Sequence, residues 1–375
     1  MALSFGILST YPPTQCGIAT FSASLSDALT AAGDSTSVVR LVDETEPLAG
    51  RVIHHFVRDR GSIAGAANAL DGHDVVVVQH EFGLYGGPDG AHVLDVIDLV
   101  AAPVIVIAHT VLSAPSTHQR AILERLVDRA DALVVMSMTA RRRLLAGYQV
   151  DASKVVVIPH GAVTESASAT AHRRPGPPRL LTWGLLGPGK GIEGAIDALS
   201  QLQTLDPAPH YRIVGQTHPR VFARDGEAYR ISLAARATDR GVADLVSFQP
   251  AYLDSGALRK VVAEADVVVL PYESREQVTS GVLIEAVAAR KPVVATAFPH
   301  AVELLASGAG LVVPHADPDA LAHAVHRVLT EPDLAAAMTR HAAAAAPDLR
   351  WSEVAMRYRA LGAELVEAHT SLAVR

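Results

Sequence analysis

Short apolar runs rich in β-branched residues recur along the chain, and each is followed by a stretch with helical periodicity. Runs such as VVVV and VIVI are apolar without alternation, which is typical of strands buried on both faces of a parallel sheet. Six strands are expected in the first half: Leu3–Leu8, Ser37–Val42, Asp74–Gln79, Pro103–Ala108, Ala132–Met136 and Val155–Ile158. The helices expected among them include Ile18–Ala32, Gly90–Leu99, His118–Arg129 and Thr139–Ala146. This alternation predicts a doubly wound α/β sheet.

The alternation stops at Ala162–Pro178, which is rich in Ser, Thr, Ala, Pro and Gly and has no apolar period. We interpret this segment as an interdomain connection. Six further strands are expected near Leu180–Trp183, Tyr211–Val214, Leu245–Phe248, Val267–Leu270, Val293–Ala295 and Leu311–Val313. A length of 375 residues also favours two domains. We therefore expect one domain at 1–165 and a second at 176–350, with a final helix at about 351–370 that serves no further strand.

The composition excludes several classes of protein. Hydrophobic residues make up 49% and charged residues 19% of the chain, which indicates a globular protein with ample core. A net charge of −7 argues against nucleic-acid binding. The single cysteine, Cys16, excludes an internal disulfide and favours a reducing, cytoplasmic location. The N-terminus is expected to be a buried strand rather than a signal peptide, and no apolar run approaches the roughly 18 to 20 residues of a membrane-spanning helix.

One basic cluster leaves room for contact with a membrane. Arg141, Arg142 and Arg143 follow one another in an expected helix. We interpret them as a solvated helix face, with a peripheral contact at the inner membrane face as the alternative. The sequence does not determine the oligomeric state.

A glycine-rich loop follows the strand that opens the second half. Gly187, Gly189 and Lys190 lie in the stretch TWGLLGPGKGIEGAIDAL, between an expected strand and an expected helix. Glycines allow a ligand to approach the backbone, and free amides at a helix start attract phosphate. The spacing matches neither the dinucleotide fingerprint nor a P-loop. The loop is either an anion site with Lys190 as its cation or an ordinary tight turn.

A second candidate anion site follows the strand Val267–Leu270. There Thr279, Ser280 and Gly281 open a helix, so hydroxyls and unpaired amides meet. Glu285 lies four residues past Gly281, about one turn inside the helix, where it can accept hydrogen bonds from a ribose diol. The structural alternative is that Ser280 only caps the helix and Glu285 is solvated.

Three histidines and one loop mark the first half. His80, His109 and His160 each follow an expected strand, and binding groups gather at the carboxyl ends of parallel strands. Each alone is most simply structural, but together they favour at least one ligand contact. No close-spaced metal ligands accompany them, so no metal site is expected. The first loop, STYPPTQCGIATF, is stiffened by two prolines and ends at Gly17 before a helix.

These residues together resemble the retaining GT-B glycosyltransferases, in particular the nucleotide-sugar-dependent family 4. The first loop is similar to that family's glycine motif, and AHT around His109 is similar to its donor-sugar histidine. VVMSMTARRRLL, KVVVIPHG and WSEVA resemble further landmarks, so the resemblance covers nearly the whole chain. It implies two Rossmann-like domains facing a cleft, an acceptor-side first domain, a donor-binding second domain and a C-terminal helix that crosses back to the first domain.

The chain departs from the family pattern at two positions. The family holds the diphosphate with an Arg and a Lys five residues apart; Lys190 fits, but the arginine position is Leu185. Arg179, Arg275 and Arg290 are nearby in sequence and are candidates to replace it. Of the family's paired glutamates, Glu285 fits the second, while the first is Gln277. The departures indicate a variant subfamily.

The resemblance implies transfer of a hexose from a nucleotide diphosphate sugar to a hydroxyl acceptor with retention and without a metal or other cofactor. Lys190, His109 and Gln277 are the expected catalytic residues. The donor is expected to contact Gly17, Gly187, Gly189, Lys190, Thr279, Ser280, Gly281 and Glu285, and the acceptor His80 and Glu81. Mannose or glucose on GDP, UDP or ADP all remain open, with GDP-mannose slightly favoured by the resemblance. The alternatives are a phosphorylase-like enzyme of the same fold, a non-catalytic sugar-nucleotide binding protein and an epimerase.

Overall fold

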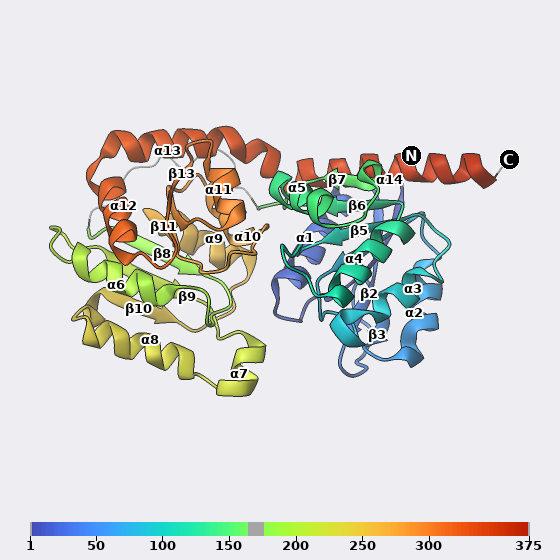
Figure 1. The fold of residues 1–375 in the computed structure, drawn as a ribbon, viewed down its shortest axis with the longest axis horizontal. Coiled ribbons are helices and arrows are strands. Elements are labelled where there is room, and N and C mark those ends of the chain that lie inside the picture. The colour runs from blue at the N-terminus through green and yellow to red at the C-terminus, as the bar shows by residue number, and fades with distance from the viewer. Residues whose placement is uncertain (1, 164–175, 374–375) are drawn as a thin grey trace. The chain divides into compact units, whose positions relative to one another are not determined.

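The computed structural model describes residues 2–163 and 176–373. The chain divides into two compact units: Met1–Gly161 with Trp351–Arg375, and Ala162–Arg350. Figure 1 shows both units as sheets covered by helices. The expected connection Ala162–Pro178 lies mostly outside the described residues.

The first unit is built on a parallel sheet of seven strands in the order β3-β2-β1-β4-β5-β6-β7. The strands are β1 (Ser4–Ser9), β2 (Ser35–Val42), β3 (Val52–Val57), β4 (Val75–His80), β5 (Val104–Ala108), β6 (Ala132–Val135) and β7 (Val155–Val157). The six expected strands are confirmed to within two residues. The expectation of only six was wrong, because β3 lies at the sheet edge and two histidines interrupt its apolar run VIHHFV.

Helices cover this first sheet. They are α1 (Gly17–Ala31), α2 (Ile63–Leu70), α3 (His92–Ile97), α4 (Thr117–Arg129), α5 (Met138–Gly147) and α14 (Trp351–Ala373). The last of these packs against α1 (Figure 1) and buries Val354, Ala355 and Tyr358 in the same core as Phe5 and Phe21. The expectation that the C-terminal helix returns to the first domain is therefore confirmed.

The second unit has a six-stranded parallel sheet in the order β10-β9-β8-β11-β12-β13. Its strands are β8 (Arg179–Trp183), β9 (His210–Val214), β10 (Val246–Gln249), β11 (Val267–Leu270), β12 (Val293–Thr296) and β13 (Gly310–Val313). Its helices are α6 (Ile192–Leu202), α7 (Pro219–Asp225), α8 (Ala228–Asp239), α9 (Ser255–Glu264), α10 (Gly281–Ala288), α11 (Pro299–Leu305), α12 (Pro318–Thr330) and α13 (Pro332–Ala345). All six strands expected in this half are confirmed.

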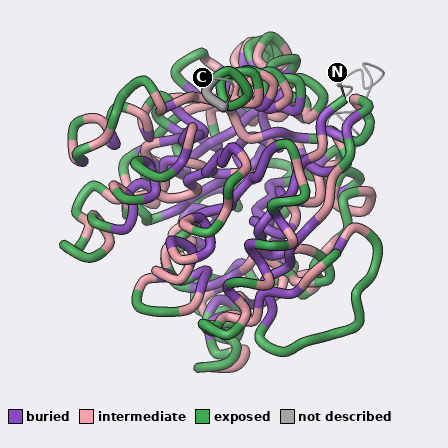
Figure 2. Tube along the Cα trace, turned by 90° about the vertical axis from the view of Figure 1, so that its right-hand side faces the viewer, coloured by how far each residue is buried: buried purple, intermediate pink, exposed green. Residues whose placement is uncertain are grey.

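Strand β11 shows why continuous apolar runs predict sheets covered on both faces. Val267 and Val269 belong to a core with α6, α8 and α12, whereas Val268 and Leu270 point into a second core with α9, α10 and α11. Successive side chains of a strand point to opposite faces, so both faces must be covered. Figure 2 shows buried segments of the chain in purple, with exposed loops in green around them. The doubly wound α/β architecture is confirmed.

The strand orders locate the binding edges. In the first unit β1 lies between β2 and β4, and in the second unit β8 lies between β9 and β11. At these two points the winding of the chain reverses, and ligands of such sheets bind outside the carboxyl ends of the flanking strands. The loops after β1 and β4, and those after β8 and β11, are therefore the places to look.

No helix in the described part of the chain is long and apolar enough to cross a membrane. The basic cluster on α5 is only partly exposed. Arg142 faces solvent, while Arg143 Nη1 donates to the Val111 carbonyl at 2.9 Å. A peripheral contact with a membrane stays a prediction.

Candidate functional site

In the second unit, the loops after β8 and β11 form one platform. Gly191 has a φ of +63°, and a Cβ on it would lie 1.8 Å from the Pro271 carbonyl oxygen, so only glycine fits. The Glu273 amide donates to the Gly189 carbonyl at 3.0 Å. The glycine-rich loop is thereby held against the loop that carries Gln277 and Thr279.

Lys190 is positioned by an aromatic ring from that second loop. Its Nζ lies 4.4 Å from the ring centroid of Tyr272, which is buried. Burial lowers the pKa of Lys190. A cation in a partly dry site interacts more strongly with an anion than one in water. The arrangement prepares Lys190 to receive a negatively charged ligand.

The start of α10 supplies hydroxyls and amides beside this lysine-bearing platform. Ser280 caps the helix, since its Oγ accepts from the Leu283 amide at 3.2 Å. The Thr279 hydroxyl, by contrast, is buried and has no hydrogen-bond partner among the described residues. Buried hydroxyls are almost always satisfied. Thr279 is thus the hydroxyl of this turn that has no hydrogen-bond partner in the described part of the chain.

His300, at the start of α11, holds this turn in place. Its Nδ1 accepts from the Ser280 amide at 2.9 Å, and its own amide donates to the Gln277 carbonyl at 3.2 Å. One buried residue therefore fixes the backbone of both, Ser280 through its side chain and Gln277 through its amide. Sequence reasoning missed His300, although it follows a strand in the same way as the three histidines of the first half.

Glu285 lies one turn inside α10 and is partly buried. The indole Nε1 of Trp183, at the end of β8, donates to its Oε2 at 3.2 Å. Burial raises the pKa of Glu285 to about 7. A carboxylate that is desolvated with only one hydrogen-bond donor gains from further donors, such as the hydroxyls of a ribose.

The proposed replacements for the missing arginine are separated by the structure. Arg179 begins β8, where its amide is bound by Asp266 and its guanidinium by Glu264 at 3.8 Å. Arg290 lies two residues after the end of α10, next to a lysine bound to the carbonyl of Ala265 before β11. Both lie at the amino edge of the sheet, away from Lys190, so these two expectations were wrong. Arg275 lies in the loop after β11, at the carboxyl edge.

In the first unit, two of the three histidines pack on the ring of Phe21, and His80 packs on Phe82. Phe21 contacts His109 and His160 edge-on, with ring centroids 5.1 Å and 5.0 Å apart. Trp351 of α14 packs 5.0 Å from Phe21 and 5.6 Å from His160. The final helix thus completes the binding edge as well as the core.

Burial keeps all three imidazoles neutral. It lowers the pKa of His80 to about 4 and that of His160 to about 4, and together with the other two histidines it lowers the pKa of His109 to about 3. His109 Nε2 donates to Gln79 Oε1 at 2.6 Å, which leaves Nδ1 as an acceptor. No three metal-binding side chains gather within residues 2–163 and 176–373. This edge offers neutral hydrogen-bonding groups and aromatic surface.

The other sequence-predicted residues of the first unit differ in exposure. His80 is 1% exposed, and neither ring nitrogen has a partner among the described residues. Glu81, the next residue, is exposed. Gly17 begins α1 and is also exposed. His109 and Gly17 belong to the first unit, whereas Lys190, Gln277 and the remaining donor residues belong to the second.

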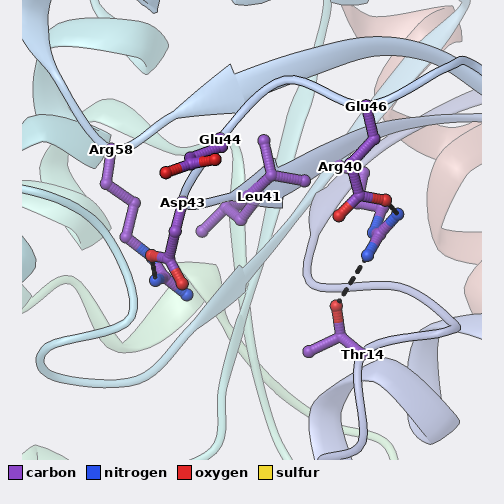
Figure 3. Close-up of a pocket in the computed structure, with 8 residues that line it drawn as sticks. Thr14, Arg40, Leu41, Asp43, Glu44, Glu46 and Arg58 are labelled. Atoms are coloured by element: carbon purple, nitrogen blue, oxygen red, sulfur yellow. Dashed lines mark hydrogen bonds and ion pairs between the residues drawn. The ribbon is translucent and has the colours of Figure 1, made fainter.

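A polar pocket of roughly 320 Å³ opens at the carboxyl end of β2 (Figure 3). Arg40, almost fully buried, donates to Glu46 at 3.0 Å and to the Thr14 hydroxyl at 3.1 Å. Arg58 pairs with Asp43 and also donates to the Leu84 carbonyl at 2.9 Å. Thr14 thus brings the first loop to the pocket, and Arg58 connects the pocket wall to the loop after β4. Sequence reasoning missed the pocket, because Thr14 and Arg58 are distant in the chain from the run at 40–46 and the residues form no motif.

The chain matches two family models. Residues 16–166 match Glycosyltransferase Family 4, and residues 164–345 match Glycosyl transferases group 1. The D-inositol 3-phosphate glycosyltransferase of Acidothermus cellulolyticus is 32% identical over 236 residues, which is 60% of this chain and 51% of that protein. The same enzyme from Geodermatophilus obscurus is 31% identical over 258 residues, or 65% and 56% of the two chains. The chain spans about half the length of the curated relatives it matches.

Solved structures share the fold. Sucrose-phosphate synthase from Thermosynechococcus elongatus superposes with a TM-score of 0.74 at 20% identity, covering 97% of this chain and 99% of that one. Anabaena HepE in complex with UDP-glucose gives 0.72 at 17% identity, with 98% and 100% covered. The two family matches, which follow one another from residue 16 to residue 345, support a group 1 glycosyltransferase, and the solved structures share the GT-B fold.

Proposed function

We propose that this chain transfers a hexose of mannose or glucose type from a nucleotide diphosphate sugar to a hydroxyl acceptor, with retention and without a metal. The observation that carries the proposal is Lys190 seated 4.4 Å above the Tyr272 ring at the carboxyl edge of the second sheet. The unsatisfied Thr279 hydroxyl and the carboxyl of Glu285 lie on the helix that follows. Lys190 and the Thr279 hydroxyl suit a diphosphate, and the carboxyl of Glu285 suits a ribose.

The relatives support a sugar-nucleotide donor. HepE is described in complex with UDP, with UDP and glucose, and with UDP-glucose. The curated relatives are named D-inositol 3-phosphate glycosyltransferases, which is in keeping with a hydroxyl-rich acceptor. Leu185 and Gln277 define the variant subfamily that we propose for this chain.

In the proposed reaction, the bond between the anomeric carbon and the diphosphate oxygen breaks, and a bond to the acceptor oxygen forms on the same face. The acceptor proton passes to the departing diphosphate, so the protein need not supply a base. Lys190 and the amides at the start of α10 stabilise the charge that develops on the diphosphate, an effect that is commonly the largest in such sites. Gln277 and His109 orient the sugar, and Glu285 holds the ribose.

We place the acceptor on the first unit. Thr14 of the first loop lines the pocket around Arg40 and Arg58, and Arg58 also donates to Leu84 in the loop after His80, which contains Glu81. Its carboxylates and guanidinium groups alternate, which suits a ligand whose hydroxyls both donate and accept. The loops predicted for the acceptor are thus connected by a polar cavity.

A thermal-shift screen against GDP, UDP, ADP and their mannose and glucose conjugates tests the donor. A ligand that binds only the folded protein adds about 2.7 kcal/mol of stability at a hundred times its Kd. Stabilisation by one nucleotide family supports the proposal and identifies the donor. The protein is then incubated with the sugar conjugate of that nucleotide and with candidate polyols as acceptors. NMR of the product determines the anomeric configuration. Stabilisation by inorganic phosphate alone would favour the phosphorylase-like alternative.

A further inference from the structure

The segment after β9 packs directly on the loop that carries Lys190. The Leu186 amide donates to the Gln216 carbonyl at 2.9 Å, and the His218 amide donates to the Leu186 carbonyl at 2.7 Å. A Cβ on Gly187 would lie 3.2 Å from Val221 and 3.9 Å from the Cβ of His218. A third loop therefore borders the platform formed by the loops after β8 and β11.

A hydrogen-bond network fixes this segment. The Thr217 hydroxyl donates to Glu227 at 2.6 Å, and Arg230 donates both to Glu227 and to the Gly215 carbonyl, each at 3.0 Å. Gly215 in turn lies so close to the loop after β8 that a Cβ on it would be 1.8 Å from the Gly184 carbonyl oxygen. Side chains at 218 and 220 are thus presented from a rigid support.

His218 lies on this support within electrostatic reach of both Lys190 and Arg220. Burial, Arg220 and Lys190 together lower the pKa of His218. Its Nδ1 accepts from the Arg220 amide at 3.2 Å, so the neutral ring carries its proton on Nε2. The ring therefore offers a hydrogen-bond donor, and Arg220 adds a full positive charge. Positive charges on both sides of a neutral donor favour an anion bound at that donor.

We propose that His218 and Arg220 complete the diphosphate site with Lys190, and that the segment after β9 supplies the donors that Leu185 does not. The ligand is the diphosphate group of a nucleoside diphosphate or of its sugar conjugate. His218 Nε2–H binds one phosphate oxygen, and the Arg220 guanidinium offsets the charge of the leaving diphosphate. The inference rests on the proposed transferase function. It assigns diphosphate binding to a loop in which no sequence motif indicated a site.

Binding constants of four variants test the proposal. His218→Ala and Arg220→Ala are compared with His210→Ala, at the opposite end of β9, and with Arg224→Ala, which is exposed on the same helix α7. Calorimetry is run with the nucleoside diphosphate that stabilises the wild type most, its monophosphate, pyrophosphate and inorganic phosphate. We expect the first two variants to weaken diphosphate binding roughly ten- to a hundredfold each. Binding of the monophosphate should weaken less than binding of the diphosphate. The two control variants should bind all four ligands as the wild type does.

A second variant separates ligand binding from helix capping. His218 is also the N-cap of α7, a role that asparagine fills well with a shorter side chain. His218→Asn should therefore keep the melting temperature of the wild type and still lose affinity for the diphosphate. Wild-type affinity in both His218→Asn and Arg220→Ala would overturn the proposal.

The outcomes distinguish this proposal from the transferase function itself. If Lys190→Ala loses the diphosphate while His218→Ala and Arg220→Ala retain it, the inference is wrong and the function stands. If the wild type binds inorganic phosphate but no nucleotide, the diphosphate assignment and the transferase function both fail.

Discussion

The two units of this protein use the same architecture to present opposite kinds of chemistry. Each is a parallel sheet whose winding reverses beside its first strand, and each carries its candidate groups on the loops at that point. The edge of the first unit displays neutral imidazoles packed on Phe21 and Trp351. The edge of the second displays a lysine over an aromatic ring and a carboxyl whose pKa is raised. The fold thus determines where ligands meet the chain, and the loops determine the charge they meet.

The largest effect should come from removing the cation of the second edge. Lys190→Ala is expected to lower kcat about a hundred- to a thousandfold, because the negative charge that develops on the diphosphate loses the nearby positive charge of the lysine. The loss of the contact with Tyr272 costs only about 1–2 kcal/mol of stability. Lys260→Ala, an exposed lysine in the same unit, is the control. Normal turnover in Lys190→Ala contradicts the role given to this edge.

The two units should differ in their stability to acid. A histidine whose pKa is lowered on folding contributes stability that is present above pH 6.5 and is lost as pH falls towards about 4. We expect each of these histidines to cost the first unit about 2 kcal/mol between pH 7 and pH 5. The protein has two tryptophans, Trp351 in the first unit and Trp183 in the second. Trp183→Phe leaves Trp351 as the only tryptophan, and Trp351→Phe leaves Trp183.

The fluorescence of Trp351 should report unfolding at a higher pH than that of Trp183. A single transition, seen alike by both tryptophans, means that the histidines do not set the acid stability of the first unit. Circular dichroism at pH 7.5 confirms that both substituted proteins start out folded.

The carboxyl of the second edge should respond to pH in the opposite direction. The pKa of Glu285 is raised to about 7 by burial, so its stabilising contribution is full below pH 4.5 and is lost as pH rises through 7. Glu285→Gln should therefore raise the free energy of unfolding by about 1–2 kcal/mol at pH 8 and change it little at pH 5. Urea denaturation at the two values measures this. If Glu285→Gln lowers the free energy of unfolding equally at pH 5 and pH 8, burial does not raise the pKa of this carboxyl as we infer.

The smallest effect is expected at the pocket of the first edge. Arg58→Ala removes a guanidinium that lies at the pocket wall and pairs with Asp43. A hydrogen bond to a partly exposed group contributes about 1 kcal/mol, so the acceptor KM should rise about fivefold. The donor KM should stay constant, and Arg125→Ala on α4 serves as a surface control. A rise in the donor KM alone would reverse the assignment of the two edges.

Local patterns predicted most of this molecule. Continuous apolar runs located twelve of the thirteen strands, and only β3 escaped, because His54 and His55 break its run. Lys190 and Glu285 were found because each lies in a short motif after a strand. Tyr272, Trp183 and His300 support these residues from other strands and helices. Such contacts depend on tertiary packing, which spacing along the sequence does not encode.

The return of α14 to the first unit has a consequence for the order in which the chain acquires its structure on the ribosome. The second unit ends at Arg350, whereas the first unit needs Val354 and Tyr358 to close its core and Trp351 to cover His160. The unit that is synthesised first is therefore completed last. Until the final helix emerges from the ribosome, the apolar face of α1 that receives it is open to water and to other nascent chains.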